Sequence, residues 1–354
     1  MKKRIALEIC AGGGGQALGL ELAGFDHAAV VEIDKNACAT LRRNRPAWNV
    51  IEADLRTFDG RPFQGIDLLA GGVPCPPFSI AGKQLGENDE RDLFPEALRL
   101  VKEIRPRAVM LENVRGLASP KFAEYRAKIL SELEGLGYRA DFKLINASDF
   151  GVPQSRSRFI LIALLREYAG RFEWPKPAGT PPTVGAVLQE LMAARGWVGA
   201  QRWAQLASQV APTIVGGSKK HGGPDLGPTR ARSQWLELGV NGIGIAAEAP
   251  GDDFPEDGTP KLTVQMVARI QGFPDSWRFD GPKTAAYRQV GNAFPPPVAK
   301  ALGQAISKAI SASEKPVGLE RGLTSLPLLE LMERGAKIAK EIRVKSYQPS
   351  LAEL

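Results

Sequence analysis

The sequence contains little of what metal sites and disulfide frameworks require. It has two histidines, His27 and His221, and three cysteines, Cys10, Cys38 and Cys75, with no Cys-x-x-Cys spacing. An odd number of scattered thiols is unlike a disulfide-stabilised secreted domain and indicates a reducing compartment. So few imidazole and thiolate groups also give a zinc ion little to bind. We therefore expect no metal and a cytoplasmic location.

Long apolar runs and a large excess of one charge are also missing. No stretch approaches the roughly 20 apolar residues of a membrane span, and the basic residues 2–4 are not followed by a long apolar segment. We expect neither a membrane helix nor a signal peptide. The 46 Lys and Arg residues exceed the 39 Asp and Glu residues by 7. This balance permits a polyanionic partner without requiring one.

What the first 165 residues do contain is an alternation of short apolar runs with amphipathic stretches. This pattern predicts a parallel α/β sheet with helices on both faces. From about residue 172 the chain becomes rich in Gly, Pro and Trp, and regular periodicity returns only near residue 262. At 354 residues the chain could form one large domain or two ordinary ones. Strands are predicted at residues 5–9, 28–33, 66–70, 108–111 and 158–164, and later helices at residues 262–270, 297–310 and 328–342.

A glycine-rich turn follows the first predicted strand. Gly12, Gly14 and Ala17 match the pattern G-x-G-x-x-[G/A], which lets a backbone approach a nucleotide closely. Glu32, at the end of the second strand, can accept hydrogen bonds from both hydroxyls of a ribose, and Asp54 falls where a third loop would reach an adenine. The same residues could also form an ordinary turn and two solvated or capping acids. A nicotinamide-dependent oxidoreductase would use the same turn.

Cys75 lies between Pro74 and Pro76, and this restricts its backbone on both sides. Such restraint is typical of a thiol that must meet a reacting atom at one angle, although a buried structural cysteine beside a turn would read the same way. Glu112 ends the strand at residues 108–111, at the edge where parallel α/β sheets bind ligands. A capping acid is the alternative for Glu112.

Together these blocks resemble the DNA cytosine-5 methyltransferases, which use S-adenosylmethionine. The likeness covers roughly residues 1–165 and 261–310. It implies a Rossmann-like methyltransferase sheet with helices on both faces, plus a smaller irregular target-recognition domain. The matching blocks are residues 11–15, 23–25, 32, 54, 74–75, 78–83, 112–114, 154–158, 271–274 and 289–293.

The resemblance implies a domain division and a set of cofactor contacts. Residues 1–171 and 275–312 would form the catalytic domain and residues 172–274 the target-recognition domain, followed by a tail of unassigned role at residues 313–354. S-adenosylmethionine would leave as S-adenosylhomocysteine. Its expected contacts are Cys10, Ala11, Gly12, Gly14, Gly15, Glu32, Ile33, Asp54, Leu55, Pro74, Leu93, Asn292 and Ala293.

The resemblance also implies the catalytic roles. Cys75 would add to C6 of a cytosine that has left the duplex, which makes C5 able to accept a methyl group. Glu112 would hold N3 and the exocyclic amine, Arg158 would reach O2, and Arg156 would orient Glu112. From the residues alone, Gln154, Arg156 and Arg158 are spaced to share one strand face, although solvated charges on an edge strand would have the same spacing.

Duplex DNA is the implied partner. Residues 79–92 would form a loop closing over the extruded base, and basic residues between 195 and 235 would contact phosphates and guanines. Trp197, Trp203 and Trp235 in that region are more typical of a core than of base stacking. The expected DNA contacts are Ser79, Lys83, Gln84, Arg91, Gln154, Arg202, Thr213, Lys219, Lys220, Arg230 and Arg232.

Three positions depart from the family pattern: Cys10 stands where an aromatic residue is usual, Glu8 replaces Asp, and Gln265 with Met266 replaces an Arg-Glu pair. We expect a monomeric bacterial enzyme, nucleoid-associated through DNA, that acts either beside a restriction endonuclease without a stable complex or as an orphan enzyme with no such partner. A tRNA-directed member of the family and a catalytically silent DNA-binding module are alternatives. The long insertion favours DNA over tRNA.

Overall fold

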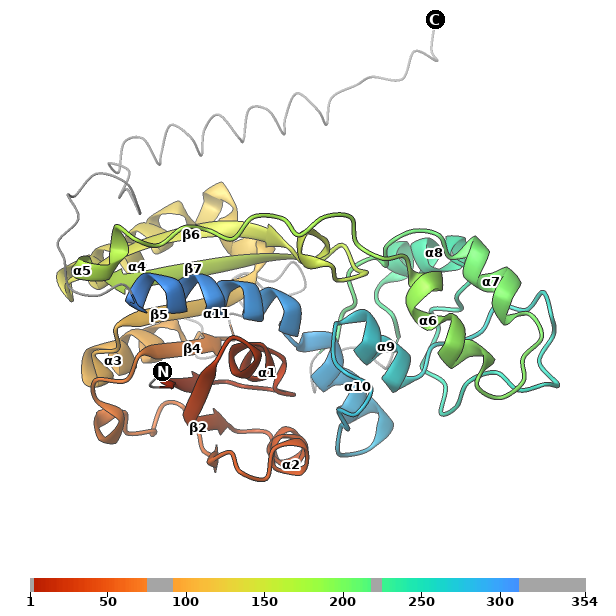
Figure 1. Cartoon of the computed structure of the whole chain (residues 1–354), viewed down its shortest axis with the longest axis horizontal. Helices are drawn as coiled ribbons and strands as arrows, with labels where there is room; N and C mark the ends of the chain where they lie inside the picture. The colour runs from red at the N-terminus through yellow and green to blue at the C-terminus, as the bar shows by residue number, and fades with distance from the viewer. Residues whose placement is uncertain (1–2, 75–91, 218–224, 312–354) are drawn as a thin grey trace, which may run out of the picture.

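The computed structural model describes residues 3–74, 92–217 and 225–311. Its centre is a seven-stranded sheet in the order β3-β2-β1-β4-β5-β7-β6 (Figure 1). The first five strands are parallel, whereas β7 runs antiparallel to both β5 and β6. The strands are β1 (Arg4–Ile9), β2 (Phe25–Glu32), β3 (Val50–Glu52), β4 (Leu68–Gly72), β5 (Ala108–Val114), β6 (Tyr138–Asn146) and β7 (Ser157–Leu165).

The expected α/β sheet is confirmed. The prediction that its strands are parallel is wrong for β7, which is antiparallel to both of its neighbours. A parallel neighbour needs a crossover of a dozen or more residues, usually a helix. Residues 147–156 between β6 and β7 contain only one 3-10 turn at Ala147–Phe150, so the chain folds back on itself. The antiparallel return places β7 between β5 and β6, in the interior of the sheet.

Helices cover both faces of the sheet. Leu7, Val109 and Leu161 belong to one core cluster with the apolar residues of α3 and α4, whereas Ala6 and Met110 belong to another with α11. Strands buried on both faces read as continuous apolar runs, which is why they were visible in the sequence. The helices are α1 (Gly15–Leu22), α2 (Lys35–Asn44), α3 (Phe94–Ile104), α4 (Ala123–Gly135), α5 (Arg166–Ala169), α6 (Val184–Ala193), α7 (Ala200–Leu206), α8 (Thr229–Glu237), α9 (Val264–Ile270), α10 (Lys283–Asn292) and α11 (Pro296–Ser311).

Helices α6, α7 and α8 extend beyond the sheet, next to α9 and α10 (Figure 1). They surround a core that contains Trp197, Trp203 and Trp235, each at most 4% exposed. The indole nitrogens of Trp197 and Trp203 donate to the carbonyls of Pro255 and Gly239 at 2.9 and 3.0 Å. The prediction that these tryptophans are core residues is confirmed.

The unusual Met266 has a structural reason at the start of α9. Thr263 caps the helix by accepting from the Met266 amide at 3.2 Å, and the Met266 sulfur accepts from the Thr263 amide at 3.4 Å. Met266 is 1% exposed and contributes to the same core as the tryptophans. The Met266 thioether therefore accepts a hydrogen bond from the N-cap amide, as the carboxylate of a Glu at this helix position does, but from within an apolar core. Within the described ranges no helix is long and apolar enough to cross a bilayer.

Candidate active site and cofactor pocket

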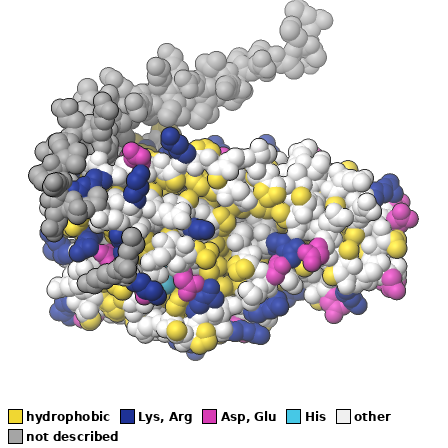
Figure 2. All heavy atoms as spheres, viewed as in Figure 1, with side chains coloured by type: hydrophobic (Ala, Val, Ile, Leu, Met, Phe, Trp, Pro, Cys, Tyr) yellow, Lys and Arg dark blue, Asp and Glu magenta, His cyan; other side chains and the backbone are white. Residues whose placement is uncertain are grey.

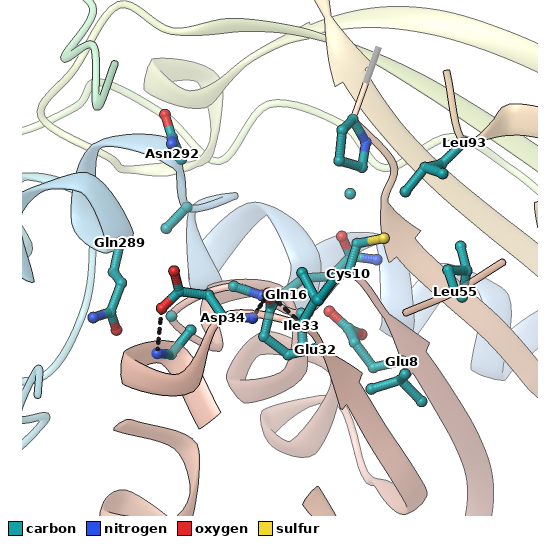
Figure 3. A pocket seen from close by; sticks show the side chains of 18 of the residues that line it. Glu8, Cys10, Gln16, Glu32, Ile33, Asp34, Leu55, Leu93, Gln289 and Asn292 are labelled. Atoms are coloured by element: carbon teal, nitrogen blue, oxygen red, sulfur yellow. Dashed lines mark hydrogen bonds between the residues drawn. The ribbon is translucent and has the colours of Figure 1, made fainter. Parts of the chain in front are cut away.

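A cavity of about 510 Å³ opens where β1, β2, β4 and β5 end (Figure 3). This volume is typical of a small-molecule site. The end of α10 contributes to its wall, so segments far apart in the sequence meet there. Among the residues that line it are Cys10, Ala11, Gly12, Glu32, Ile33, Asp54, Leu55, Pro74, Leu93, Glu112, Asn292 and Ala293.

Two acids on the wall are held by backbone amides. One oxygen of Glu32 accepts from the Gly12 amide at 2.6 Å, and the other accepts from the amides of Ile33 and Asp34 at 2.9 and 2.8 Å. Asp54 accepts from the Arg56 amide at 3.0 Å and pairs with its guanidinium at 3.0 Å. The hydrogen bond from the Arg56 backbone amide lowers the pKa of Asp54, and the charge of the Arg56 guanidinium lowers it further. Asp54 is therefore ionised near neutral pH.

The glycine turn has two functions in the structure. Cys10 and Gly12 line the cavity with φ angles of 51° and 55°, a left-handed backbone that few residues other than glycine adopt. Gly14 and Gly15, which were expected to contact a cofactor, are not among the lining residues. A Cβ on Gly14 would lie 2.8 Å from the Trp277 ring, and one on Gly15 would lie 2.3 Å from the Phe294 carbonyl oxygen. These two glycines are needed for close packing behind the turn.

Two polar side chains at the cavity have no hydrogen-bond partner within the described part of the chain. Glu8 is 0% and Gln16 is 3% exposed, and neither carboxylate oxygen nor either amide atom has a hydrogen-bond partner among the described residues. Burial raises the pKa of Glu8 well above that of an ordinary glutamate. Both were missed as site residues in the sequence, although both lie in or beside the glycine turn. Unpaired buried polar groups are costly, so they indicate a polar ligand.

Glu112 joins the same cavity at the end of β5. It lies opposite Gly72 of β4, and a Cβ on Gly72 would be 3.2 Å from a Glu112 oxygen. Its carboxylate pairs with Arg158 Nε at 2.8 Å. Burial raises the pKa of Glu112, while the charges of Arg158 and Arg156 oppose the rise. The carboxyl can therefore be protonated at a higher pH than an exposed glutamate.

The segment that carries Cys75 leaves the sheet at the cavity rim. Cys75 itself lies outside the described residues, but Pro74 lines the cavity, and its carbonyl accepts from the Leu93 amide at 3.3 Å. Asn113 donates to the carbonyl of Val73 at 2.9 Å. The residue after Glu112 thus fixes the strand end from which the Pro-Cys segment continues.

The contact with Glu112 that was expected for Arg156 is made by Arg158, and the contact of Arg158 with O2 of the base stays a prediction. Arg156 is 1% exposed and donates to the carbonyls of Ile214, Gly291 and Ala293 at 2.7, 2.9 and 3.0 Å. Arg156 directly precedes β7, and its guanidinium is bonded to the end of α10.

The expected DNA contacts are divided between exposed and buried positions. Arg202 and Arg230 are exposed, Arg232 lies 3.5 Å from Asp225, and Thr213 donates to the carbonyl of Ser155 at 2.6 Å. Gln154 does not match its expected contact, because its side chain is 0% exposed and both ends are paired inside the protein. Ser79, Lys83, Gln84, Arg91, Lys219 and Lys220 lie outside the described residues, as do His221 and residues 312–354.

Basic side chains do not form one large patch on the face drawn in Figure 2. Lys and Arg residues are scattered there among Asp and Glu residues. No group of three or more His, Cys, Asp or Glu side chains in the described ranges is arranged to hold a metal ion.

Comparison with known proteins identifies the family. Residues 5–308 match the model of the C-5 cytosine-specific DNA methylases. The Type II methyltransferase M.NaeI of Lentzea aerocolonigenes is 57% identical over 317 residues, covering 88% of this chain and 76% of that protein. The Type II methyltransferase M.NgoMIV of Neisseria gonorrhoeae is 55% identical over 309 residues, covering 86% and 97%.

Solved structures share the fold at low identity. The Spodoptera frugiperda DNMT2 mutant has a TM-score of 0.61 at 19% identity, covering 86% of this chain and 99% of that chain. The Entamoeba histolytica methyltransferase EhMeth has a TM-score of 0.62 at 15% identity, covering 88% and 100%. The family resemblance predicted from the motifs is therefore confirmed, and the chain belongs to the C-5 cytosine-specific DNA methylases, as a DNA cytosine-5 methyltransferase.

Proposed function

We propose that this enzyme transfers a methyl group from S-adenosylmethionine to C5 of a cytosine flipped out of a specific duplex DNA sequence, through a covalent bond between Cys75 and C6. The main support is one shared cavity. Its wall contains both the acids expected to bind the cofactor, Glu32 and Asp54, and the acid expected to bind the base, Glu112. An oxidoreductase that used the glycine turn alone would not need Glu112 at this position.

The residues fit S-adenosylmethionine along its whole length. Glu32 suits the ribose hydroxyls and Asp54 the adenine amine, while Ile33 offers an apolar side chain that is 61% exposed on the wall. The unpaired Glu8 and Gln16 suit the ammonium and carboxylate of the amino-acid end. Cys10 is small where the family has an aromatic ring. Burial and the nearby charge of Glu32 raise its thiol pKa, so it is a neutral neighbour for the purine.

When bound, S-adenosylmethionine supplies an electrophilic methyl group. The protein's part is to make C5 nucleophilic. The Cys75 thiolate forms a bond to C6, and electrons move through the ring toward C5 while Glu112 donates a proton to N3. Later N3 returns its proton to Glu112, a base takes the C5 proton, and the bond between C6 and Cys75 breaks with its electrons returning to sulfur, which restores the aromatic ring. Arg158 holds the Glu112 carboxyl in place throughout.

We further propose that residues 1–171 and 275–312 form the catalytic domain and that residues 172–274 read the target. Exposed Arg202 and Arg230 and the partly exposed Thr213 lie in the second region. Two relatives are named Type II methyltransferases, which supports a role beside a restriction endonuclease.

Bisulfite sequencing of DNA from a bacterial host that expresses the chain tests the function directly. We expect 5-methylcytosine at one position of a single short sequence throughout the plasmid and chromosome. A host that carries the Cys75→Ser gene is the control and should show none above background. Absence of 5-methylcytosine in both hosts, with equal soluble expression, would reject the proposal.

A second prediction concerns the amino-acid end of the cofactor. S-adenosylhomocysteine has this end, whereas 5′-methylthioadenosine lacks it. Gln16→Leu and Glu8→Gln should each weaken S-adenosylhomocysteine binding about 10-fold or more, because a hydrogen bond to a charged group contributes roughly 1.5–3 kcal/mol. Both variants should bind 5′-methylthioadenosine as the wild type does.

Calorimetric titration of S-adenosylhomocysteine and of 5′-methylthioadenosine into the wild type, Gln16→Leu and Glu8→Gln gives these affinities. Gln234→Leu, at an exposed glutamine of α8, is the control and should change neither. Equal weakening of both ligands would show that Gln16 and Glu8 only shape the pocket.

A further inference from the structure

Three separate segments of the chain meet around Arg156. They are the lead-in to β7, the segment of residues 211–217, and the end of α10. Arg156 donates to the Ile214 carbonyl at 2.7 Å and to the carbonyls of Gly291 and Ala293 at 2.9 and 3.0 Å. A planar guanidinium can serve several acceptors at fixed angles, which an ammonium cannot do as well. One buried side chain thus fixes Ile214 relative to α10.

Two buried glutamines strengthen the same junction. Gln154 accepts from the Ile214 amide at 2.9 Å and donates to the side-chain oxygen of Gln271 at 2.8 Å. Gln271 in turn donates to the Val290 carbonyl at 2.8 Å. Both glutamines are 0% exposed, so losing any of these bonds would leave a polar group unpaired in the core. Gln154 and Arg156 therefore share Ile214 as a partner, and Gln154 is connected to α10 through Gln271.

A direct contact between two glycines adjoins these bonds. A Cβ on Gly291 would lie 2.5 Å from the Gly216 Cα, and a Cβ on Gly216 would lie 2.5 Å from the Asn292 side-chain oxygen. No side chain can be inserted without moving one backbone away from the other. Tyr287 adds another tie, because its hydroxyl lies 3.1 Å from the Val215 carbonyl oxygen.

The end of α10 also forms part of the cofactor pocket. Gln289, Asn292 and Ala293 line the cavity, and the side-chain amide of Asn292 donates to the Gly217 carbonyl at 3.1 Å. Residues 211–217 contain Thr213 and lead into residues 218–224, where Lys219 and Lys220 were expected to contact DNA. Residues 211–217 are therefore seated against the end of α10, which also lines the cofactor pocket.

We propose that Arg156 and the Gly216–Gly291 contact act as a positioning device, which holds the DNA-reading segment at a fixed distance and angle from the cofactor. This inference rests on the proposed function, because it assumes that residues 211–217 belong to the target-reading part. It assigns Arg156 a role in target recognition, acting through Ile214, instead of orientation of Glu112.

The test compares Gly216→Ala and Arg156→Lys with the wild type. Each should weaken binding of a duplex that carries the methylated target sequence about 10-fold. Each should also reduce discrimination against a duplex with one changed base pair about 5-fold or more, which is within the affinity range that one mismatch normally costs. S-adenosylhomocysteine affinity should fall by less than DNA affinity. The added Cβ of Gly216→Ala displaces Asn292, but Glu8, Glu32 and Asp54 line the pocket from other elements and keep their positions. Gly170→Ala is the matched control, since nothing lies within 4 Å of its added Cβ, and it should match the wild type.

Fluorescence anisotropy with labelled duplexes, calorimetry with S-adenosylhomocysteine and thermal melting of each protein give the three readouts. Tyr287→Phe, which removes the bonds from the α10 hydroxyl to the Val215 and Asp225 carbonyls, is the milder variant if Gly216→Ala does not fold. A lower melting temperature with unchanged discrimination would overturn the inference, and so would equal losses for DNA and S-adenosylhomocysteine. A wild type that neither binds S-adenosylhomocysteine nor methylates DNA would instead reject the proposed function.

Discussion

Replacing Cys75 with serine should abolish methyl transfer and the covalent bond to DNA. A duplex that carries 5-fluorocytosine at the target should trap the wild type, because fluorine replaces the proton that must leave C5 before the sulfur can depart. A serine hydroxyl is a far weaker nucleophile at neutral pH than a thiolate. We expect a loss of about 10⁴-fold or more, the order seen when a nucleophile is removed from other enzymes.

Denaturing electrophoresis and intact mass spectrometry detect the adduct, and transfer of a labelled methyl group measures the rate. Cys38→Ser is the matched control, because Cys38 is buried outside the cavity and its thiol donates only to the Glu32 carbonyl at 3.4 Å, as a hydroxyl can. That variant should form the adduct in normal yield. Adduct formation by Cys75→Ser would disprove the covalent mechanism.

Replacing Glu112 with glutamine should lower the rate by about 10²–10⁴-fold and change its pH dependence. Burial raises the pKa of Glu112, and only the protonated carboxyl can donate a proton to N3. The wild-type rate should therefore fall as pH increases through this pKa. Cys75 has the opposite requirement, because its thiol must be deprotonated, so the full profile should be bell-shaped. Glutamine does not titrate, so the alkaline fall should disappear in Glu112→Gln.

Single-turnover methyl transfer measured across the pH range separates these limbs. Glu103→Gln, an acid paired with Arg99 away from the cavity, is the control and should keep the wild-type profile. S-adenosylhomocysteine binding by Glu112→Gln should remain, which would show that the pocket is intact. An unchanged alkaline limb in Glu112→Gln would assign that ionisation to another group.

The buried strands of the sheet could be predicted from the sequence because they appear in it as continuous apolar runs. Strands β1, β2, β4, β5 and β7 carry apolar residues on both faces, and each was expected within a few residues of its true bounds. Strand β3 is only Val50–Glu52, and β6 alternates in charged residues such as Arg139 and Lys143, so neither stood out. Helices α6, α7 and α8 are short and were read as irregular. Periodicity is weak where an element is brief or half exposed.

The motifs identified most of the pocket but could not separate lining from packing. Gly12 and Gly14 look alike in the sequence, yet one lines the cavity and the other contacts Trp277 from a distant segment. Gln154, Arg156 and Arg158 share one motif, yet only Arg158 contacts Glu112. These differences depend on what lies opposite each side chain, and this is set by chain segments that are far apart in the sequence, such as Arg156 and Ile214, 58 residues apart, or Arg156 and Gly291, 135 residues apart.

Local order along the chain was thus enough to identify the family and to suggest the chemistry that we propose. A thiol between prolines, an acid at a strand end and a glycine turn before a helix are each fixed by neighbours in the sequence. Only the tertiary structure decided which partner each polar group has. Hydrogen bonding acts over about 3 Å, so the unpaired state of Glu8 and Gln16 and the seating of Ile214 on Arg156 arise only when separate segments come together.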